Sequence, residues 1–597
     1  MKKHLAVFLC VFAAALAQAA PKPAPVPANL NVVELPTYTV SAERVLPPQE
    51  SWRYAALPGY EILSDASEKN TKRFIEEFQR FRVGVSLIWP DIVVTKPTVP
   101  TLILLCSNNS FKPFIPLNPD PGTYITTTSI FVEDKERGSI VIDFSANEIF
   151  DNIEGTTLLV DPYKEFYRQY TRFLMRRANG NPIPPWLESG LAQLFSTVDV
   201  DKKSVEFARL TEDFNRGIFT ADDTQDKSVE YVGYVLNPYT GNSNFDWLHQ
   251  SRYDDGFAPH TPVGVRSAPL REAPADSPEK KPALWIFPLQ GLFDPKSRHY
   301  NNHYWNQECF AFVHMCLYGA QKKYQRAFVE FARLACARPV TEADFKKCFG
   351  RSYAQMTTLL RRYVSMPNHQ VVTLKSKRGS PPIPRPQPVA LRDATDAEVG
   401  RIKGETLRLA GYAGDSRDTL IAPYIRKNAD AALLASLGLL ETLEGRKERA
   451  RKFLEAAARE KAVRPRAYLE LARLRHADAL AAPKANNGLK FDAAQTAAIL
   501  DPLMIARSQP PAMPEVYLLI ADTWRRSAQN PTPEQLNVLL EGTVRCPRNA
   551  EILLQTAELL AQNGDEKMAA RLVNLGIASS RNNATRKQFE DLREKLQ

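Results

Sequence analysis

The sequence predicts an α+β region followed by an all-α solenoid of helical hairpins. Strand-like and helix-like patterns alternate between residues 51 and 145. A Pro-rich stretch at residues 366–395 then interrupts the chain, and beyond residue 396 apolar and small positions recur after 34 residues. At 597 residues the chain is too long for a single hydrophobic core, which predicts three or four folded units.

The first 19 residues have the pattern of a cleavable signal peptide. Lys2 and Lys3 precede an apolar run at residues 5–17, and residues 17–19 have the small-x-small form of a cleavage site. The run is too short to span a bilayer comfortably. We therefore expect secretion to a periplasm or out of a bacterial cell, without a transmembrane segment. Residues 20–50 are rich in Pro and Ala, which predicts an extended linker.

Residues 51–145 have the pattern of an α/β module. Buried strands are predicted at residues 60–64, 101–106 and 139–144, because short apolar runs rich in β-branched residues are typical of covered strands. An amphipathic helix is predicted at residues 68–89. Its inward face is predicted to consist of Phe74, Phe78, Phe81, Val85 and Leu87.

Two later segments carry the most informative motif. Arg168-Gln169-Tyr170-Thr171-Arg172 is followed, after a short loop, by Pro184-Pro185-Trp186-Leu187-Glu188-Ser189-Gly190-Leu191-Ala192. With patches at residues 287–293, 304–319 and 345–363, these segments resemble secreted bacterial zinc metallopeptidases of the gluzincin, MA-like type. The resemblance covers residues 55–365. It implies an α+β, thermolysin-like fold whose core is residues 146–365, with an irregular insertion at residues 200–282.

In that family a helix bearing His-Glu-x-x-His precedes a helix that begins Pro-x-Trp-Leu-x-Glu-Gly-Leu-Ala, whose Glu is the third zinc ligand. The resemblance places Arg168 and Arg172 at the two His positions, Gln169 at the general base and Ser189 at the third ligand. A guanidinium offers a metal no lone pair, and Gln is not a base near neutral pH. We therefore expect a degenerate site with no metal, cofactor or catalytic residue.

Nearby carboxylates are expected to fill this degenerate site. Glu188 stands one residue, about 100° of helix rotation, out of register with the third ligand. Glu165 and Glu188 are predicted to pair with Arg168 or Arg172 through ionic hydrogen bonds. In gluzincins a strand before the metal helix pairs with the substrate backbone. Residues 140–143 therefore have two interpretations, a peptide-binding edge and a covered strand.

Cysteine and histidine spacing adds little chemistry. Cys309 and Cys316 lie seven apart on an apolar helix, which favours buried thiols, and His314 on the same helix reads as a core histidine. A disulfide between Cys336 and Cys348 is one pairing that the spacing leaves open.

Beyond residue 396 the pattern is that of tetratricopeptide-like repeats. Leu434 and Leu437 recur 34 residues later as Tyr468 and Leu471. Stacked hairpins of this type leave a concave surface that commonly binds peptides or partner proteins. A purely structural helical cap is the competing interpretation.

Charge and motifs together favour a binding protein. The formal charge of +10 is interspersed along the chain, without a basic stripe carrying stacking aromatics, and with the export signal this excludes nucleic acid as the expected partner. We expect an exported, catalytically inactive metallopeptidase-like protein that binds an unknown protein or peptide through the repeats or the degenerate cleft. The alternative is a hydrolase with a relocated site, either a metal held by His299, His303 and a carboxylate or an arginine-lined cleft for an anionic substrate.

Overall fold

The structure of the protein is a computed structural model. It describes residues 35–38, 46–90, 99–107, 109–116, 124–125, 129–145, 148–151, 156–159, 161–179, 183–209, 286–294, 303–366, 369, 371–375, 383–482, 490–546, 549–580 and 583–596. The predicted signal peptide, most of the 20–50 linker and most of the 200–282 insertion lie outside these residues.

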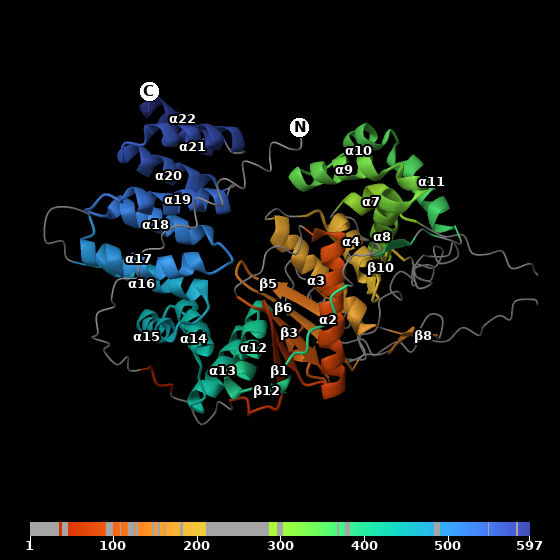
Figure 1. Ribbon diagram of the computed structural model, residues 1–597, viewed down its shortest axis with the longest axis horizontal. Helices are drawn as coiled ribbons and strands as arrows, with labels where there is room; N and C mark the ends of the chain where they lie inside the picture. The colour runs from red at the N-terminus through yellow and green to blue at the C-terminus, as the bar shows by residue number, and fades with distance from the viewer. Residues whose placement is uncertain are drawn as a thin grey trace, which may run out of the picture.

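A seven-stranded mixed sheet forms the centre of the α/β part (Figure 1). Its order is β12-β1-β2-β3-β6-β5-β4; strands β2, β3 and β6 run parallel, and the other pairs are antiparallel. The strands are β1 (Arg53–Leu57), β2 (Tyr60–Ser64), β3 (Thr101–Cys106), β4 (Tyr124–Ile125), β5 (Ser129–Glu133), β6 (Gly138–Asp143) and β12 (Arg392–Asp393). The three strands predicted from apolar runs are confirmed.

Both faces of this sheet are covered by helices. Alternate strand residues such as Ile62 and Ile103 pack on one face in a core that includes aromatic residues of α2 (Glu68–Ile88) and α3 (Pro162–Asn179). Leu63 and Leu104 point to the opposite face, where they pack with α12 (Asp396–Leu409). The first helix of the C-terminal array is therefore also the outer layer of the sheet.

One expectation for α2 is wrong, and one of the two interpretations of residues 140–143 is excluded. Leu87 is 49% exposed, because it lies about 200° around the helix from the buried Val85. Strand β6, which contains residues 140–143, lies between β3 and β5. Its backbone is paired on both sides, so it offers no peptide-binding edge.

A helical layer follows α3 along the chain. It comprises α4 (Pro185–Ser196), α7 (Leu289–Phe293), α8 (His303–Tyr318), η5 (Ala320–Lys322), α9 (Gln325–Ala337), α10 (Glu342–Phe349) and α11 (Tyr353–Val364). The remaining short elements are η2 (Lys112–Phe114), β7 (Glu148–Asp151), β8 (Thr156–Leu159), β9 (Asp199–Val200), β10 (Ser204–Phe207) and β11 (Val372–Lys375). Cys309 and Cys316 are buried thiols, whereas Cys336 and Cys348 are free, so the disulfide considered above is absent.

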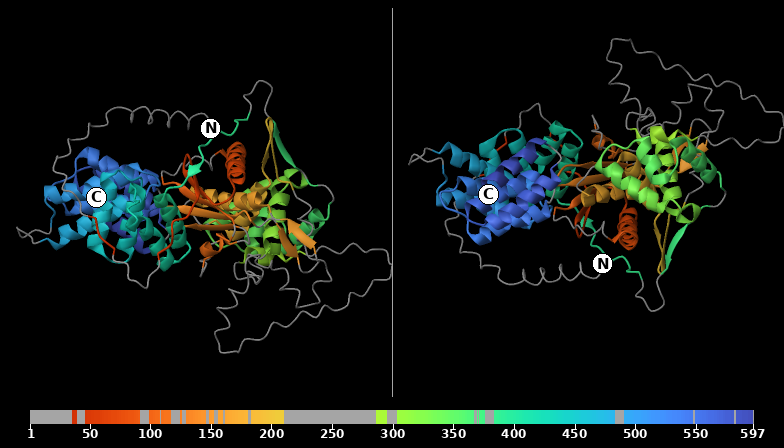
Figure 2. Two further views of the ribbon diagram at one scale, coloured as in Figure 1. Left: turned by 90° about the horizontal axis from the view of Figure 1, so that it is seen from below. Right: turned by 90° about the horizontal axis from the view of Figure 1, so that it is seen from above.

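The C-terminal region is an all-helical, tetratricopeptide-like solenoid of antiparallel hairpins. Gly438 lets α14 approach α15 closely, since a Cβ there would lie 2.6 Å from the Leu454 side chain. In Figure 2 these helices form one lobe and the α/β elements the other. The helices after α12 are α13 (Ala413–Ile425), α14 (Ala431–Leu443), α15 (Lys447–Arg459), α16 (Pro465–Ala481), α17 (Ala493–Ser508), α18 (Pro514–Arg526), α19 (Pro533–Arg545), α20 (Ala550–Gln562), α21 (Glu566–Ser579) and α22 (Asn583–Lys595).

The described end of the Pro-rich stretch, residues 383–395, packs against the α/β part. Gln387 exchanges two hydrogen bonds with the Gln79 side chain, at 2.8 and 2.9 Å. Strand β12 then adds to the sheet edge beside β1, and a capping box formed by Thr395 and Glu398 starts α12 immediately afterwards. Proline content predicted an extended backbone, but the contacts that fix this backbone come from α2 and β1.

Candidate functional site

Helices α3, α4 and α8 meet where the sequence predicts a degenerate zinc site. Arg168, Gln169 and Arg172 lie on α3, and Ser189 lies on α4. Aromatic residues such as Phe166 and Tyr170 hold α3 against the sheet core. Helix α4 crosses α8 so closely at Gly190 that a Cβ there would lie 2.7 Å from the Cys309 carbonyl oxygen. The structure thus brings the four predicted positions into one region.

Gln169, at the general-base position, connects the helix to the sheet. Its side chain is fully buried, and its Nε2 donates to the Ser129 hydroxyl on β5 at 3.0 Å. Its Oε1 accepts from Arg172 Nη1 at 3.3 Å. The amide therefore performs a structural bridging role that needs both a donor and an acceptor, which a carboxylate would not supply.

Arg172 is a buried cation. Only 3% of its surface is exposed. Burial lowers the pKa of its guanidinium to about 9, although the nearby Glu165 carboxylate opposes this shift. The group is still protonated at neutral pH, so a divalent metal at this position would meet a positive charge.

One of the two predicted carboxylate pairings is present and the other is not. Glu165 forms an ion pair with Arg168. Glu188 pairs with Arg176 at 2.7 Å, not with Arg168 or Arg172, because its place on α4 faces the next turn of α3. Burial raises the pKa of the Glu188 carboxyl to about 8.

Ser189, at the third-ligand position, is buried and donates to Asn306 Oδ1 on α8 at 2.5 Å. Sequence reasoning missed Asn306 and Arg176 as members of this site. Asn306 lies on α8, in the patch at residues 304–319, to which the family resemblance assigns no functional residue. Arg176 lies one helical turn beyond Arg172, the last residue of the motif on α3. Helical spacing from Arg172 was the one signal that pointed to Arg176.

A cavity of about 450 Å³ opens beside Arg168, which is 23% exposed. Helices α2, α3, α4 and α8 and the strands β9 and β10 line it. Arginines line it, as in the alternative hypothesis of a cleft for an anionic substrate, but acidic side chains face it as well. The charged lining residues are Arg73, Arg80, Lys164, Arg168, Arg209, Glu77, Asp161, Asp199 and Glu206.

The other alternative places a metal at His299 and His303. His299 lies outside the described residues, and only the backbone of His303 is described. Among the side chains that the structure describes, no group of three or more His, Cys, Asp or Glu residues is arranged to hold a metal ion. His314 is buried, with its two ring nitrogens 2.8 Å from the Tyr363 hydroxyl and the Ala208 carbonyl.

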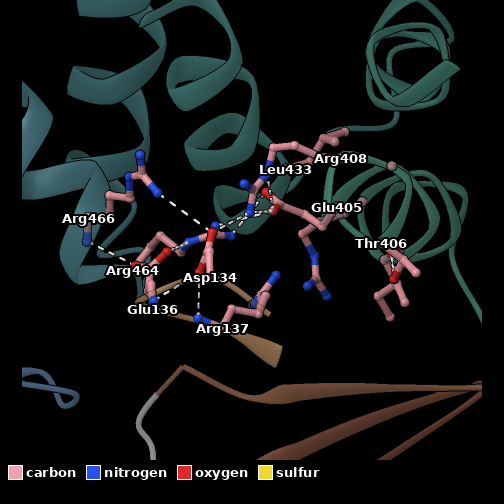
Figure 3. Close-up of polar contacts among 12 residues, drawn as sticks. Asp134, Glu136, Arg137, Glu405, Thr406, Arg408, Leu433, Arg464 and Arg466 are labelled. Carbon is pink, nitrogen blue, oxygen red and sulfur yellow. Dashed lines mark hydrogen bonds and ion pairs between the residues drawn. The ribbon is translucent and has the colours of Figure 1, made fainter. Parts of the chain in front are cut away.

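A second polar cluster joins the sheet to the solenoid (Figure 3). Arg464, just before α16, donates to Glu136 at 2.7 Å in the β5–β6 turn and to Glu405 at 3.1 Å on α12. Arg408 reaches Asp134 at 2.8 Å and Glu405 at 3.0 Å. Most of these charged groups therefore have an oppositely charged partner. The partners come from the β5–β6 turn, α12 and the residues just before α16.

The carboxylates of this junction are held in their ionised form. Burial alone would raise the pKa of Glu405, but Arg464, Arg408 and Arg137 hold it well below its ordinary value. Glu61 on β2 behaves in the same way, since Arg401 on α12 donates to both its oxygens and lowers its pKa to about 2 despite burial. Buried ion pairs thus join the sheet to the array at this junction.

Comparisons with known proteins give limited information. No family model matches the chain, and no curated protein matches its sequence. A tetratricopeptide-repeat protein of Thermus thermophilus is 14% identical, with a TM-score of 0.23, covering 32% of this chain and 96% of that one. Yeast Tom70 is 13% identical, with a TM-score of 0.24, covering 50% of each chain. The description of the array as tetratricopeptide-like therefore rests on its own hairpins and their recurrence.

No helix in the described part of the chain combines the length and apolar character needed to cross a bilayer.

Proposed function

We propose that this chain is an exported, catalytically inactive metallopeptidase-like protein that acts as a scaffold and binds a protein or peptide through its helical array. The observation that carries the proposal is the state of the former zinc positions. Arg172 is a buried cation bonded to Gln169, and Ser189 is bonded to Asn306. These side chains fill the space among α3, α4 and α8 with contacts that leave no metal-binding donor set.

The rigid junction supports a scaffold role. Arg464 and Arg401 tie the array to the sheet through buried ion pairs. A repeat array held at a fixed position relative to a second folded part presents its surface in one orientation, which suits assembly of partners. A mobile junction would suit transport of a partner between sites instead.

Zinc content tests the inactive-peptidase proposal. The chain from residue 20 onward is incubated with zinc, desalted and measured by inductively coupled plasma mass spectrometry. A quadruple variant, R168H/Q169E/R172H/S189E, restores the family pattern, and R168A/Q169E/R172A/S189E is its matched control without histidines. We expect no zinc above the control in the natural chain and one zinc per chain in the restored variant.

Folding of the variants is checked by circular dichroism, because histidine and carboxylate replace buried groups here. If the quadruple variant misfolds, the double variant R168H/R172H provides the same test, since two His four residues apart on a helix bind zinc. Stoichiometric zinc in the natural chain overturns the proposal and favours the hydrolase with a relocated metal.

A further inference from the structure

A short segment from the N-terminal region lies on the solenoid. Residues 35–38, Leu-Pro-Thr-Tyr, pack against α13, α14 and α15, about 400 positions later in the sequence; Figure 1 shows this red segment beside α15. The segment belongs to no strand or helix. It is held by contacts of the kind that bind an extended peptide.

Tyr38 occupies an aromatic and charged pocket. Its ring stacks on Phe453 with 6.0 Å between centroids and meets the edge of Tyr424 at 5.7 Å. The Arg449 guanidinium lies 4.3 Å from the ring centroid, a cation–π contact. The Tyr38 hydroxyl donates to Glu441, whose side chain is fully buried. The pocket therefore recognises both the face and the hydroxyl of a tyrosine.

The backbone before Tyr38 is recognised as well. The Tyr424 hydroxyl donates to the Pro36 carbonyl at 2.7 Å, and Arg449 Nη1 donates to the Thr37 carbonyl at 2.9 Å. Pro36 is buried and Leu35 packs against the array core, whereas Thr37 is exposed. Proline favours an extended conformation of the residue before it. The surface thus fits an apolar-Pro-x-Tyr sequence in extended form.

Glu441 shows why this surface requires an occupant. The carboxylate is buried in α14 and also accepts from Arg446 and Arg449. Burial would raise its pKa, but hydrogen bonds from Arg446, Tyr38 and Arg449 keep it lowered. Removing the Tyr38 side chain takes away one of these donors and the ring stacked on Phe453, so the site is stabilised by any ligand that supplies both.

We propose that α13, α14 and α15 form a binding site for extended apolar-Pro-x-Tyr peptides, that the chain fills this site with its own residues 35–38, and that a partner protein's segment of the same chemistry binds by displacing them. The inference rests on the scaffold role proposed above, for which it identifies one surface. The segment is tethered nearby, since the Pro47 carbonyl accepts from Arg426 at the end of α13 at 2.9 Å. Tethering gives the internal ligand a high effective concentration.

Fluorescence anisotropy with a fluorescein-labelled peptide of residues 31–40 tests the site. The natural chain is compared with Tyr38→Ala, which vacates the pocket. We expect the peptide to bind the Tyr38→Ala chain at least about tenfold more tightly, because internal competition is removed. A labelled peptide with Ala in place of Tyr38 is the matched control and is expected not to bind.

Two receptor variants locate the peptide. In the Tyr38→Ala chain, Tyr424→Phe removes only the hydroxyl that donates to Pro36 and is expected to weaken binding about three- to tenfold. Arg449→Met removes the cation–π contact and the Thr37 hydrogen bond together, so its loss is expected to be larger. Thermal unfolding by circular dichroism verifies that each variant is folded.

Two results overturn the inference. A folded Tyr38→Ala chain that does not bind the peptide shows that residues 35–38 are only a structural strap. A natural chain that is a dimer by light scattering and becomes a monomer on Tyr38→Ala shows that the occupant comes from a second copy. Neither result touches the zinc measurement, so failure of this inference and failure of the inactive-peptidase proposal are distinguished.

Discussion

The two buried arginine clusters of this molecule contain similar residues but differ in electrostatics. At the junction of sheet and array, burial alone would lower the pKa of Arg464, but Glu136 and Glu405 raise it above its ordinary value. On α3, burial outweighs the nearby Glu165, and the pKa of Arg172 falls to about 9. The surroundings of Arg464 stabilise its charged form, whereas the surroundings of Arg172 destabilise its charged form.

This difference in pKa shift distinguishes the interface between sheet and array from the candidate site on α3 and α4. Ion pairs of Arg464 join the array to the sheet, although burial lowers the pKa of the neighbouring Arg137 to about 10. A buried cation whose charged form is disfavoured reduces stability, and strongly shifted groups of this kind cluster at functional positions.

The same substitution at both clusters is the strongest test of this contrast. Arg464→Met leaves Glu136 and Glu405 buried without their partner and is expected to cost about 3–5 kcal/mol of unfolding free energy. Arg172→Met removes a disfavoured charge together with one hydrogen bond, so a change of at most about 1 kcal/mol is expected. Urea unfolding of both variants measures the difference.

An exposed pair provides the control for those measurements. Lys135 is 84% exposed and contacts Glu515 at 2.8 Å, also between the sheet and the array. Lys135→Met is expected to change the unfolding free energy by less than about 0.5 kcal/mol, since solvent screens this pair. Equal losses for Arg464→Met and Arg172→Met would contradict the contrast.

Acid is expected to weaken the junction. Glu61 has a folded-state pKa of about 2, below the ordinary value of 4.5, so its contribution to stability is complete above pH 4.5 and is lost as the pH falls towards 2. The loss from this residue is on the order of 3 kcal/mol. Urea midpoints between pH 6 and pH 2.5 measure it, and Arg401→Met is expected to flatten the profile. An unchanged midpoint in the natural chain would refute the expected contribution of the Glu61–Arg401 ion pair to stability.

Helix packing between α4 and α8 offers a smaller test. Gly190→Ala places a methyl group 2.4 Å from Val313 and 2.7 Å from the Cys309 carbonyl oxygen, so a destabilisation of about 1–3 kcal/mol is expected. Gly414 near the start of α13 has open space around its missing Cβ, and Gly414→Ala is expected to stabilise by up to about 1 kcal/mol. Thermal shifts of opposite sign are the expected readout.

Local patterns predicted the local structure of the chain. The apolar runs at residues 60–64 and 101–106 are strands, and the 34-residue recurrence marks stacked hairpins. The spacing of Arg168 and Arg172 predicts both on one helix, and the family resemblance, not spacing, predicts Ser189 beside them. These features depend on residues that are close together in the sequence. The periodicity of apolar residues therefore predicts them.

Long-range partners were not predictable in the same way. Glu188 meets Arg176 instead of the motif arginines, because the crossing of α3 and α4 decides which turn it faces. Residues 35–38 and 383–395 were interpreted as linkers from their prolines, yet both pack against elements distant in sequence. Composition shows that such segments are extended, and only the tertiary fold shows what they touch.

Helix α12 has a consequence for any attempt to divide the chain. It is both the first helix of the array and the cover of one sheet face, where Ile402 and Val399 meet Leu104. A fragment that ends at residue 395 would leave a broad aliphatic strand surface in water and would self-associate. The junction therefore makes the two parts one cooperative folding unit, and a usable cut must keep α12 with the strands.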